Sequence, residues 1–466
     1  MRRAILILAD GARADLTADY LERLPNLRRL AERGGQKKLV SVWPSVTGPA
    51  HIPLLSGVHP GEANIPGLRW FDRERQVGRR RASKGLRSYC GIGNRHFSAD
   101  AGVETTLFSQ SERPLSVLEM FNRGLSGSSA SLALQTRLAW AHFNGRYAAA
   151  DRQLSNQALS GFIKENPDFT FLLLPGIDGH SHGYGPDSKE VFSSYRDLDR
   201  SVGAFLKASD RQGGETLLLV SSDHGHTRVR EHIDIDDLLV ERGLRTACHL
   251  RRLLTRDPEA VVAVSGNAMA HIYVRRQNAS WREISDSNSL AREQPGLIER
   301  LVAEPAVDIV VVRDRVGQLL IHSRRGRARL SVEEAGASIS YLSEAGADPF
   351  GYPELPEKMN STEALELSFE TNYPDALWQI LRLAESRRCG DIIVSATPGY
   401  DFRDRNEKVR HASGHGALYH EQMLVPLISS EPIVPGPGRS ADVYATIVDW
   451  MGWDPAAASS GRSLLQ

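Results

Sequence analysis

A series of short apolar runs, each soon stopped by a polar residue or a proline, constrains the fold of this chain more than any other feature. The runs are Ala4–Leu8, Leu39–Trp43, Phe169–Leu174, Thr216–Val220, Asp391–Val394 and Met423–Ile428. Continuous apolar runs of this length are typical of strands that are buried on both faces, as in parallel sheets.

Helical patterns separate these runs. Leu16–Arg33 repeats leucine at helical spacing among charged residues, and Pro25 is expected to divide it into two shorter helices, because proline fits best in a first turn. Ser193–Ser209 and Asp375–Arg387 have similar patterns. The alternation predicts an α/β fold, with a doubly wound, mostly parallel sheet that carries helices on both faces.

Two regions interrupt this alternation in a chain of 466 residues, which exceeds the size of a single hydrophobic core. A basic insertion at about 70–115 lacks clean periodicity, and residues 231–370 hold separate strand-like runs amid charged stretches. We therefore expect a core formed by residues 1–230 and 371–466, with 231–370 as a smaller inserted cap. The core sheet should resume with Asp375–Val394.

Composition argues against several kinds of partner. Lys+Arg and Asp+Glu are equal at 57 each, which gives no reason to expect a nucleic-acid polymer or an anionic membrane. The three cysteines are widely spaced, as expected in a reducing compartment. No apolar stretch approaches the ~18 residues that span a bilayer, and the first apolar run is too short for a secretory signal. We expect a cytoplasmic protein.

Three acidic residues, Asp10, Asp178 and Asp223, follow predicted strands. One aspartate in such a place can simply cap a turn or a helix. Three of them, each next to Gly or His, favour a functional site, because ligands of open parallel sheets bind outside the carboxyl ends of the strands.

Histidines accompany these carboxylates. His182 lies four residues after Asp178, so a helical turn would place both side chains on one face, and His224 directly follows Asp223. His415 stands between two glycines that allow close approach. Oxygen and nitrogen ligands without a thiolate favour zinc, with manganese or iron as alternatives.

Thr47 is the candidate nucleophile. It follows a predicted strand and precedes the apolar helical start Ile52–Leu55, so it lies near a helix N-terminus, which favours phosphate. A metal ion at its hydroxyl would lower the pKa of that group. The alternative is that Thr47 is a plain N-cap, and we expect His51 to pack in the interior rather than bind metal.

These segments together resemble the alkaline phosphatase superfamily, in particular its type I phosphodiesterase/nucleotide pyrophosphatase branch. The similar segments are PSVTGPAHIPLLSGVHPGEANIPG, DGHSHGYGP, SSDHGH, SGHGALYHEQMLVPLI and DVYATIVDWMGWDPAAASSGRSLL. The resemblance covers both ends and the middle of the core but not the cap. The residues around Thr47 lack the Cys/Ser-x-Pro-x-Arg signature, which argues against the sulfatase branch.

The resemblance implies a site with two zinc ions. The first would bind Asp178, His182 and His415, and the second would bind Asp10, Asp223, His224 and Thr47. Two metals roughly 4 Å apart can stabilise the attacking and leaving oxygens of an in-line displacement. Thr47 would attack phosphorus to form a phosphothreonine, which water would then release.

One departure from the branch concerns the substrate. Its phosphodiesterases commonly have an Asn that contacts a phosphate oxygen, and Leu68 stands at the matching position here. The candidate substitutes are Asn64, Arg69 and Asn122. The basic stretch from Arg69 to Arg87 is either a solvated loop or a guide for a polyanionic substrate.

We therefore expect hydrolysis of phosphodiester or pyrophosphate bonds in a small phosphorylated substrate, such as a nucleotide or a sugar-phosphate diester. The alternatives are a phosphomonoesterase, a transferase that hands the phosphoryl group to a bound acceptor, and a non-catalytic metal-binding protein. We expect the cap to supply the contacts with the leaving group.

Overall fold

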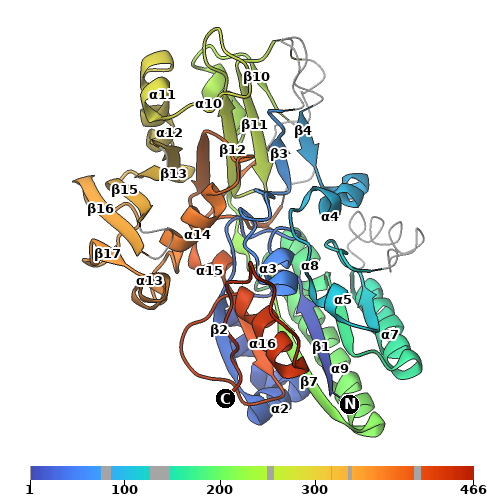
Figure 1. Ribbon diagram of the computed structural model, residues 1–466. Helices are drawn as coiled ribbons and strands as arrows, with labels where there is room; N and C mark the ends of the chain where they lie inside the picture. Colours follow the sequence, from blue (N-terminus) through green and yellow to red (C-terminus); the bar gives the residue numbers. More distant parts are fainter. Residues whose placement is uncertain are drawn as a thin grey trace.

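Two lobes, each built on its own sheet, make up the molecule (Figure 1). This computed structural model describes residues 2–74, 85–125, 147–248, 255, 257–315, 317–333, 338–403 and 411–466. The core lobe contains both ends of the chain, and the second lobe lies above it in the view of Figure 1.

Among the described residues, six strands form the core sheet, in the order β2-β21-β7-β1-β6-β5. They are β1 (Arg2–Ala9), β2 (Gln36–Val40), β5 (Pro114–Val117), β6 (Phe169–Leu174), β7 (Glu215–Ser221) and β21 (Leu424–Ser429). Strand β1 pairs in parallel with both β6 and β7, and β21 runs antiparallel to its neighbours β7 and β2. The predicted doubly wound, mostly parallel sheet is confirmed.

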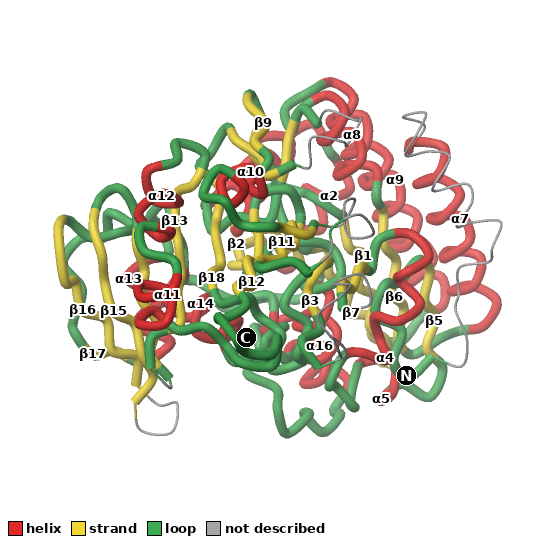
Figure 2. Tube along the Cα trace, turned by 90° about the horizontal axis from the view of Figure 1, so that it is seen from above, coloured by secondary structure: helices red, strands yellow, loops and turns green. Residues whose placement is uncertain are grey.

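Helices cover both faces of this sheet (Figure 2). They include α1 (Ala14–Tyr20), α2 (Pro25–Gly34), α3 (His51–Ser56), α4 (Phe97–Asp100), α5 (Leu107–Gln110), α7 (Tyr147–Glu165), α8 (Gly176–Tyr184), α9 (Lys189–Gln212), α15 (His420–Met423) and α16 (Ala441–Met451). Alternate residues of β1 point to opposite faces, so Leu6 packs with α3 and α16, whereas Ile5 packs with α2, α7 and α9. Pro25 opens α2, as predicted.

The second sheet has nine strands within the described ranges, in the order β10-β11-β12-β18-β13-β14-β15-β16-β17. They are β10 (Thr246–Ala247), β11 (Ala260–Ser265), β12 (Met269–Val274), β13 (Val307–Arg313), β14 (Gln318–His322), β15 (Gly326–Glu333), β16 (Ser338–Gly346), β17 (Lys358–Met359) and β18 (Ile392–Ala396). Its helices are α10 (Ile235–Val240), α11 (Ser287–Glu293), α12 (Leu297–Ala303), α13 (Ser361–Ser368) and α14 (Ala376–Ala384). We call this sheet and these helices the second lobe.

The expectation that the core sheet resumes with Asp375–Val394 is wrong. Strand β18 lies between β12 and β13 of the second sheet and is antiparallel to both, and α14 packs on the same lobe. The second sheet therefore extends past the cap boundary predicted at residue 370, and the core sheet resumes with β21. An apolar run shows that a strand is buried, but it does not show which sheet the strand joins.

The basic segment joins the two lobes. Strands β3 (Arg69–Phe71) and β4 (Leu86–Ser88) form a hairpin, and its residues Phe71 and Leu86 pack against Val261 and Tyr273 of the second sheet. Arg73 is buried and donates a hydrogen bond to Asp391 Oδ1 at 2.7 Å, so it is neither solvated nor available as a guide. The predicted guide residues Arg75, Arg79, Arg80, Arg81 and Lys84 lie outside the described residues.

Two pairs of short strands lie outside the two large sheets. Strand β9 (Glu231–Ile233) pairs with β19 (Tyr400–Phe402), and β8 (Thr227–Arg228) pairs with β20 (Ser413–Gly414). None of the described helices combines the length and the apolar character needed to cross a bilayer.

The buried ion pair of Arg73 and Asp391 generates a stability prediction. Replacement of Arg73 by Ala leaves a buried carboxylate without its cation, which costs about 3–5 kcal/mol in the free energy of unfolding. Arg28 pairs with Glu22 on the surface at 3.0 Å, so Arg28→Ala should cost less than about 1 kcal/mol. Denaturant titration checks both values, and equal losses in the two variants would contradict the prediction.

Candidate active site

The predicted metal ligands and the nucleophile meet at the carboxyl ends of the core strands. Asp10 follows β1, Asp223 follows β7, and Thr47 lies between β2 and α3. Asp178 and His182 lie one turn apart on α8, so the helical spacing expected from the sequence is confirmed. The backbone joins two of these segments directly, since the N–H of Asp178 donates to the carbonyl of Asp10 at 2.9 Å.

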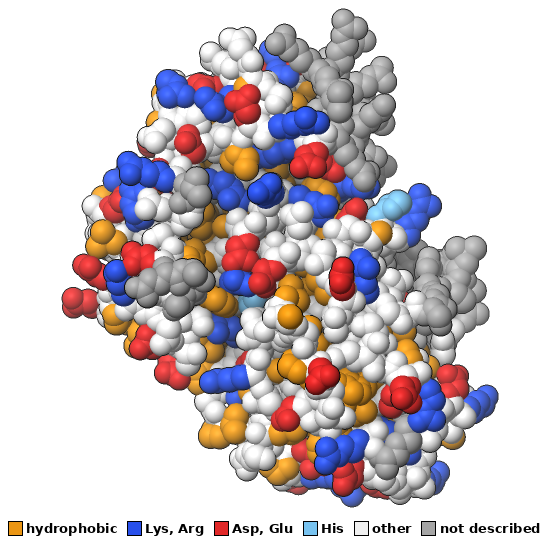
Figure 3. All heavy atoms as spheres, in the orientation of Figure 1, with side chains coloured by type: hydrophobic (Ala, Val, Ile, Leu, Met, Phe, Trp, Pro, Cys, Tyr) orange, Lys and Arg blue, Asp and Glu red, His pale blue; other side chains and the backbone are white. Residues whose placement is uncertain are grey.

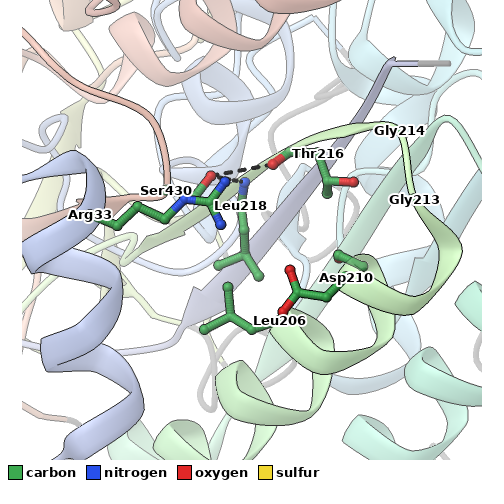
Figure 4. Close-up of a pocket in the computed structure, with 9 residues that line it drawn as sticks. Arg33, Leu206, Asp210, Gly213, Gly214, Thr216, Leu218 and Ser430 are labelled. Atoms are coloured by element: carbon green, nitrogen blue, oxygen red, sulfur yellow. Dashed lines mark hydrogen bonds between the residues drawn. The ribbon is translucent and has the colours of Figure 1, made fainter.

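The amino-terminal end of β7, opposite the end that Asp223 follows, holds a cavity of about 230 Å³ (Figure 4). It is lined by residues such as Arg33, Thr216 and Ser430, and the Ser430 hydroxyl accepts a hydrogen bond from the N–H of Leu218 at 2.9 Å. None of the predicted site residues lines this cavity.

One cluster surrounds the nucleophile. Asp10, Asp223 and His224 are buried and each offers one ligand atom within 4.8 Å of the others. The Thr47 hydroxyl lies 3.0 Å from Nε2 of His224 and donates to Oδ1 of Asp10 at 3.3 Å. Nε2 of His224 lies 3.5 Å from Asp10 Oδ1 and 3.6 Å from Asp223 Oδ2. This is the group that the resemblance assigned to the second zinc.

A second cluster lies beside the first. Asp178 Oδ1 faces Nε2 of His226 at 2.9 Å, of His182 at 3.3 Å and of His415 at 3.8 Å. These four residues could hold one metal ion. The rings of His224 and His415 stack with centroids 3.8 Å apart, so the two clusters are in direct contact.

His226 is a member of this cluster that the sequence analysis missed. It is fully buried, and its Nδ1 lies 3.0 Å from the Ser413 hydroxyl while its Nε2 faces Asp178. The signal was present in the segment Asp-His-Gly-His, where His226 follows His224 by two residues. No argument from spacing connects His226 with Asp178, because Asp178 lies on α8 and His226 lies in the loop between β7 and β8.

The tautomers of three histidines fit a metal site. Each has its Nδ1 against a backbone carbonyl, which can only accept a hydrogen bond, so Nδ1 carries the proton. The carbonyls are those of Ser413 for His182, Ser45 for His415 and Gly225 for His224, at 3.0, 3.0 and 3.2 Å. The Nε2 lone pairs then converge on carboxylate oxygens, and a bound cation relieves the repulsion between them. The donor set therefore fits two metal ions.

Burial and repulsion separate the pKa values of the carboxylates. Burial, with the charges of Asp223 and Asp178, raises the pKa of Asp10 well above its usual value. Burial also opposes ionisation of Asp178, but His182 outweighs it and holds the pKa of Asp178 well below the usual range. The same balance of burial against His224 lowers the pKa of Asp223 to about 2. Such closely packed buried carboxylates need nearby positive charge.

Gly11 makes the close packing of the two clusters possible. Its φ of 75° lies in the left-handed region, and its N–H donates to Asp223 Oδ1 at 3.3 Å. A Cβ at this position would lie 2.8 Å from Nε2 of His226 and 2.9 Å from the Cα of Asp178. Any larger residue would therefore push the clusters apart.

The described contacts of the three predicted substrate residues are with residues outside the two metal clusters. The side-chain oxygen of Asn64 accepts a hydrogen bond from Ser386 at 2.7 Å, which ties its loop to the second lobe. Arg69 begins β3 opposite Ser88, and the N–H of Asn122 donates to the Ser98 hydroxyl at 2.9 Å. No described hydrogen bond joins Asn64 or Asn122 to the clusters. A substrate role for Asn64, Arg69 and Asn122 stays a prediction.

The second lobe reaches the site through the turn between β11 and β12. The N–H of Ala268 donates to the carbonyl of His415 at 3.1 Å, and the N–H of His415 donates to the carbonyl of Gly266 at 3.2 Å. The side-chain amide of Asn267 lies 3.2 Å from Nδ1 of His411, whose ring packs against His182. The second lobe therefore forms one wall of the candidate active site.

Comparison with known proteins agrees with this geometry. Residues 4–418 match the family model of type I phosphodiesterase/nucleotide pyrophosphatase. The chain belongs to this family. The alkaline phosphatase PhoD of Zymomonas mobilis is 22% identical over 274 residues, which cover 58% of this chain and 39% of that protein. The mouse GPI ethanolamine phosphate transferase 1 is 24% identical over 251 residues, 50% of this chain and 24% of that protein.

A solved structure extends the likeness over nearly the whole chain. Murine ectonucleotide pyrophosphatase/phosphodiesterase 5, in complex with AMP, superposes with a TM-score of 0.58 and 14% identity, covering 98% of this chain and 96% of that chain. At this identity the likeness shows the fold alone. The two curated relatives are longer proteins, of which this chain spans less than half.

The two clusters generate a prediction about metal content. His415→Ala and Asp223→Ala remove a ligand, so each should lower the metal bound per chain after dialysis, as measured by elemental analysis. Thr47→Ala should keep close to the wild-type content, because three other side chains hold the same metal. Wild-type metal content in both ligand variants would remove these residues from the metal sites.

Proposed function

We propose that this protein hydrolyses phosphodiester or pyrophosphate bonds at a two-zinc site, with Thr47 as the nucleophile and a phosphothreonine intermediate. The observation that carries the proposal is the position of the Thr47 hydroxyl, 3.0 Å from Nε2 of His224 and 3.3 Å from Oδ1 of Asp10. Membership of the type I phosphodiesterase/nucleotide pyrophosphatase family supports it.

The side chains of the site prepare Thr47 for attack. Its hydroxyl donates to Asp10 Oδ1, and the same oxygen lies beside Nε2 of His224, so it faces the side-chain atoms that would bind the metal. Two bound metal ions would lower the pKa of this hydroxyl and neutralise the charge that develops on the phosphoryl oxygens. Attack forms the bond between Thr47 Oγ1 and phosphorus and expels the leaving alcohol or phosphate. Water then attacks the phosphothreonine from the opposite side and restores Thr47.

The charges at the site favour a diester over a monoester. Within the described ranges, every ion pair of Asp10, Asp178 and Asp223 is with a histidine, and none is with Arg or Lys. A monoester carries a second negative charge, which needs additional cations around its third oxygen. A diester or a pyrophosphate linkage presents less charge to the same residues.

The surroundings of the site suggest where the leaving group binds. Next to Thr47, the backbone at Gly48 packs against Met120 and Phe97, which form an apolar side. On the face shown in Figure 3, Lys and Arg side chains gather over the second lobe. An apolar wall suits the base or sugar of a nucleotide or a sugar-phosphate diester, and the AMP complex of the murine relative is in keeping with the former. A cytoplasmic location stays a prediction.

Two assays test the hydrolytic proposal. The wild type should cleave bis-p-nitrophenyl phosphate faster than p-nitrophenyl phosphate, and monoester turnover that is orders of magnitude faster would make the protein a phosphomonoesterase. Thr47→Ala should lower turnover about 10³-fold or more, because it removes the nucleophile. Thr47→Ser should keep part of the activity, since a hydroxyl remains. Near-normal turnover by Thr47→Ala would exclude Thr47 from the mechanism.

Transfer to an acceptor alcohol is the second candidate. The partial match to a GPI ethanolamine phosphate transferase favours it, because hydrolysis and transfer differ only in whether water or a bound alcohol attacks. Product analysis in the presence of candidate alcohols separates the two. A transferase yields the acceptor ester with little hydrolysis product, whereas a hydrolase yields the hydrolysis product whether or not an alcohol is added.

A further inference from the structure

His51 is a fully buried histidine directly beneath the candidate active site. It opens α3, its side chain is 0% exposed, and its ring packs edge-on to Phe171 at 6.4 Å. Nε2 of His51 lies 3.3 Å from Oδ2 of Asp223. Among the described residues, neither ring nitrogen of His51 makes a hydrogen bond of normal geometry, and neither does Oδ2 of Asp223. The sequence analysis expected His51 only to pack in the interior.

The burial of a polar ring requires an explanation. An imidazole N–H in an apolar interior costs free energy unless a partner accepts its hydrogen bond. The acceptor that faces Nε2 of His51 is the Asp223 carboxylate. At 3.3 Å the contact is long for a hydrogen bond, but an ionised acceptor strengthens it. Nε2 of His51 is therefore the nitrogen that carries the proton.

Asp223 is held at both of its oxygens. Oδ1 accepts hydrogen bonds from the backbone N–H of His224 at 3.1 Å and of Gly11 at 3.3 Å. Oδ2 lies between His51 Nε2 at 3.3 Å and His224 Nε2 at 3.6 Å. The backbone donors fix one oxygen, and His51 fixes the rotation of the carboxylate that directs the other toward the metal cluster.

We propose that His51 is a positioning residue, which orients Asp223 and so sets the affinity of the Asp10–Asp223–His224 cluster for its metal. The inference rests on the proposed two-metal function. Groups that orient a metal ligand typically change metal affinity by about 10–100-fold when they are removed. The ion-pair contact of His51 within the described residues is with Asp223, so His51 should act on the cluster that contains Asp223.

His59 provides a matched control for simple packing. It lies eight residues further along the same segment, is 1% exposed, and packs edge-on to Trp378 at 6.1 Å. Neither of its ring nitrogens has a hydrogen-bonding partner within the described ranges, as for His51. It differs in its neighbours, since burial and then the charges of Arg382 and Arg439 lower the pKa of His59 well below its usual value.

The test compares zinc affinities of the full-length chain. The metal-free wild type, His51→Met, His51→Gln and His59→Met are titrated with zinc against a chromophoric chelator, and circular dichroism checks the fold of each. Met fills a similar volume without a donor, whereas the Gln amide can donate near the position of Nε2. His51→Met should weaken one of two binding steps about 10–100-fold. His51→Gln should recover most of this loss, and His59→Met should change neither step.

Two results would overturn the proposal. One is a pair of unchanged affinities in folded His51→Met, and the other is an equal loss in His59→Met, which would make the effect one of packing. If His51→Met does not fold, His51→Phe replaces it, and His51→Gln must still bind more tightly than the donor-free variant. A wild-type chain that binds fewer than two zinc ions would instead contradict the proposed function, whatever the His51 variants do.

Discussion

The repulsion among three closely packed carboxylates is the constraint on which the rest of the site depends. Asp10 and Asp223 directly follow β1 and β7, and Asp178 lies on α8, which follows the neighbouring strand β6, so the fold itself brings their negative charges together. Each carboxylate is accompanied by an imidazole whose remote nitrogen is fixed by the backbone. The fold holds this concentration of charge only where cations bind, and a site of that kind is suited to a phosphoryl group in transfer.

Most of this site could be predicted because its information is local. Asp10 and Asp223 directly follow buried strands, and the helical spacing of Asp178 and His182 is visible in the sequence. His226 was not predictable in the same way, since it meets Asp178 of α8 through the tertiary structure, from a segment 48 residues further along the chain. The proposed role of His51 depends likewise on a tertiary contact, the one between its ring and Asp223.

In the second lobe, too, the sequence did not reveal which distant segments pair with one another. The run that forms β18 was correctly interpreted as a buried strand, but its neighbours β12 and β13 come from segments that precede it by some 80 to 120 residues, a separation that apolar periodicity does not record. Asn64 was named as one substitute for the family Asn that is missing at Leu68. Its left-handed backbone conformation and its hydrogen bond with Ser386 join the two lobes, a contact that only the tertiary structure contains.

The turn of β11 and β12 that pairs with His415 has a thermodynamic consequence. Any ion that binds His415 also favours the docked position of this turn, because binding to one of two linked states shifts the equilibrium toward it. The linkage is reciprocal, so docking of the second lobe strengthens the hold on the ion by the same factor. Metal binding at His415 and docking of the second lobe are therefore thermodynamically linked. A ligand that binds against the turn would shift both equilibria.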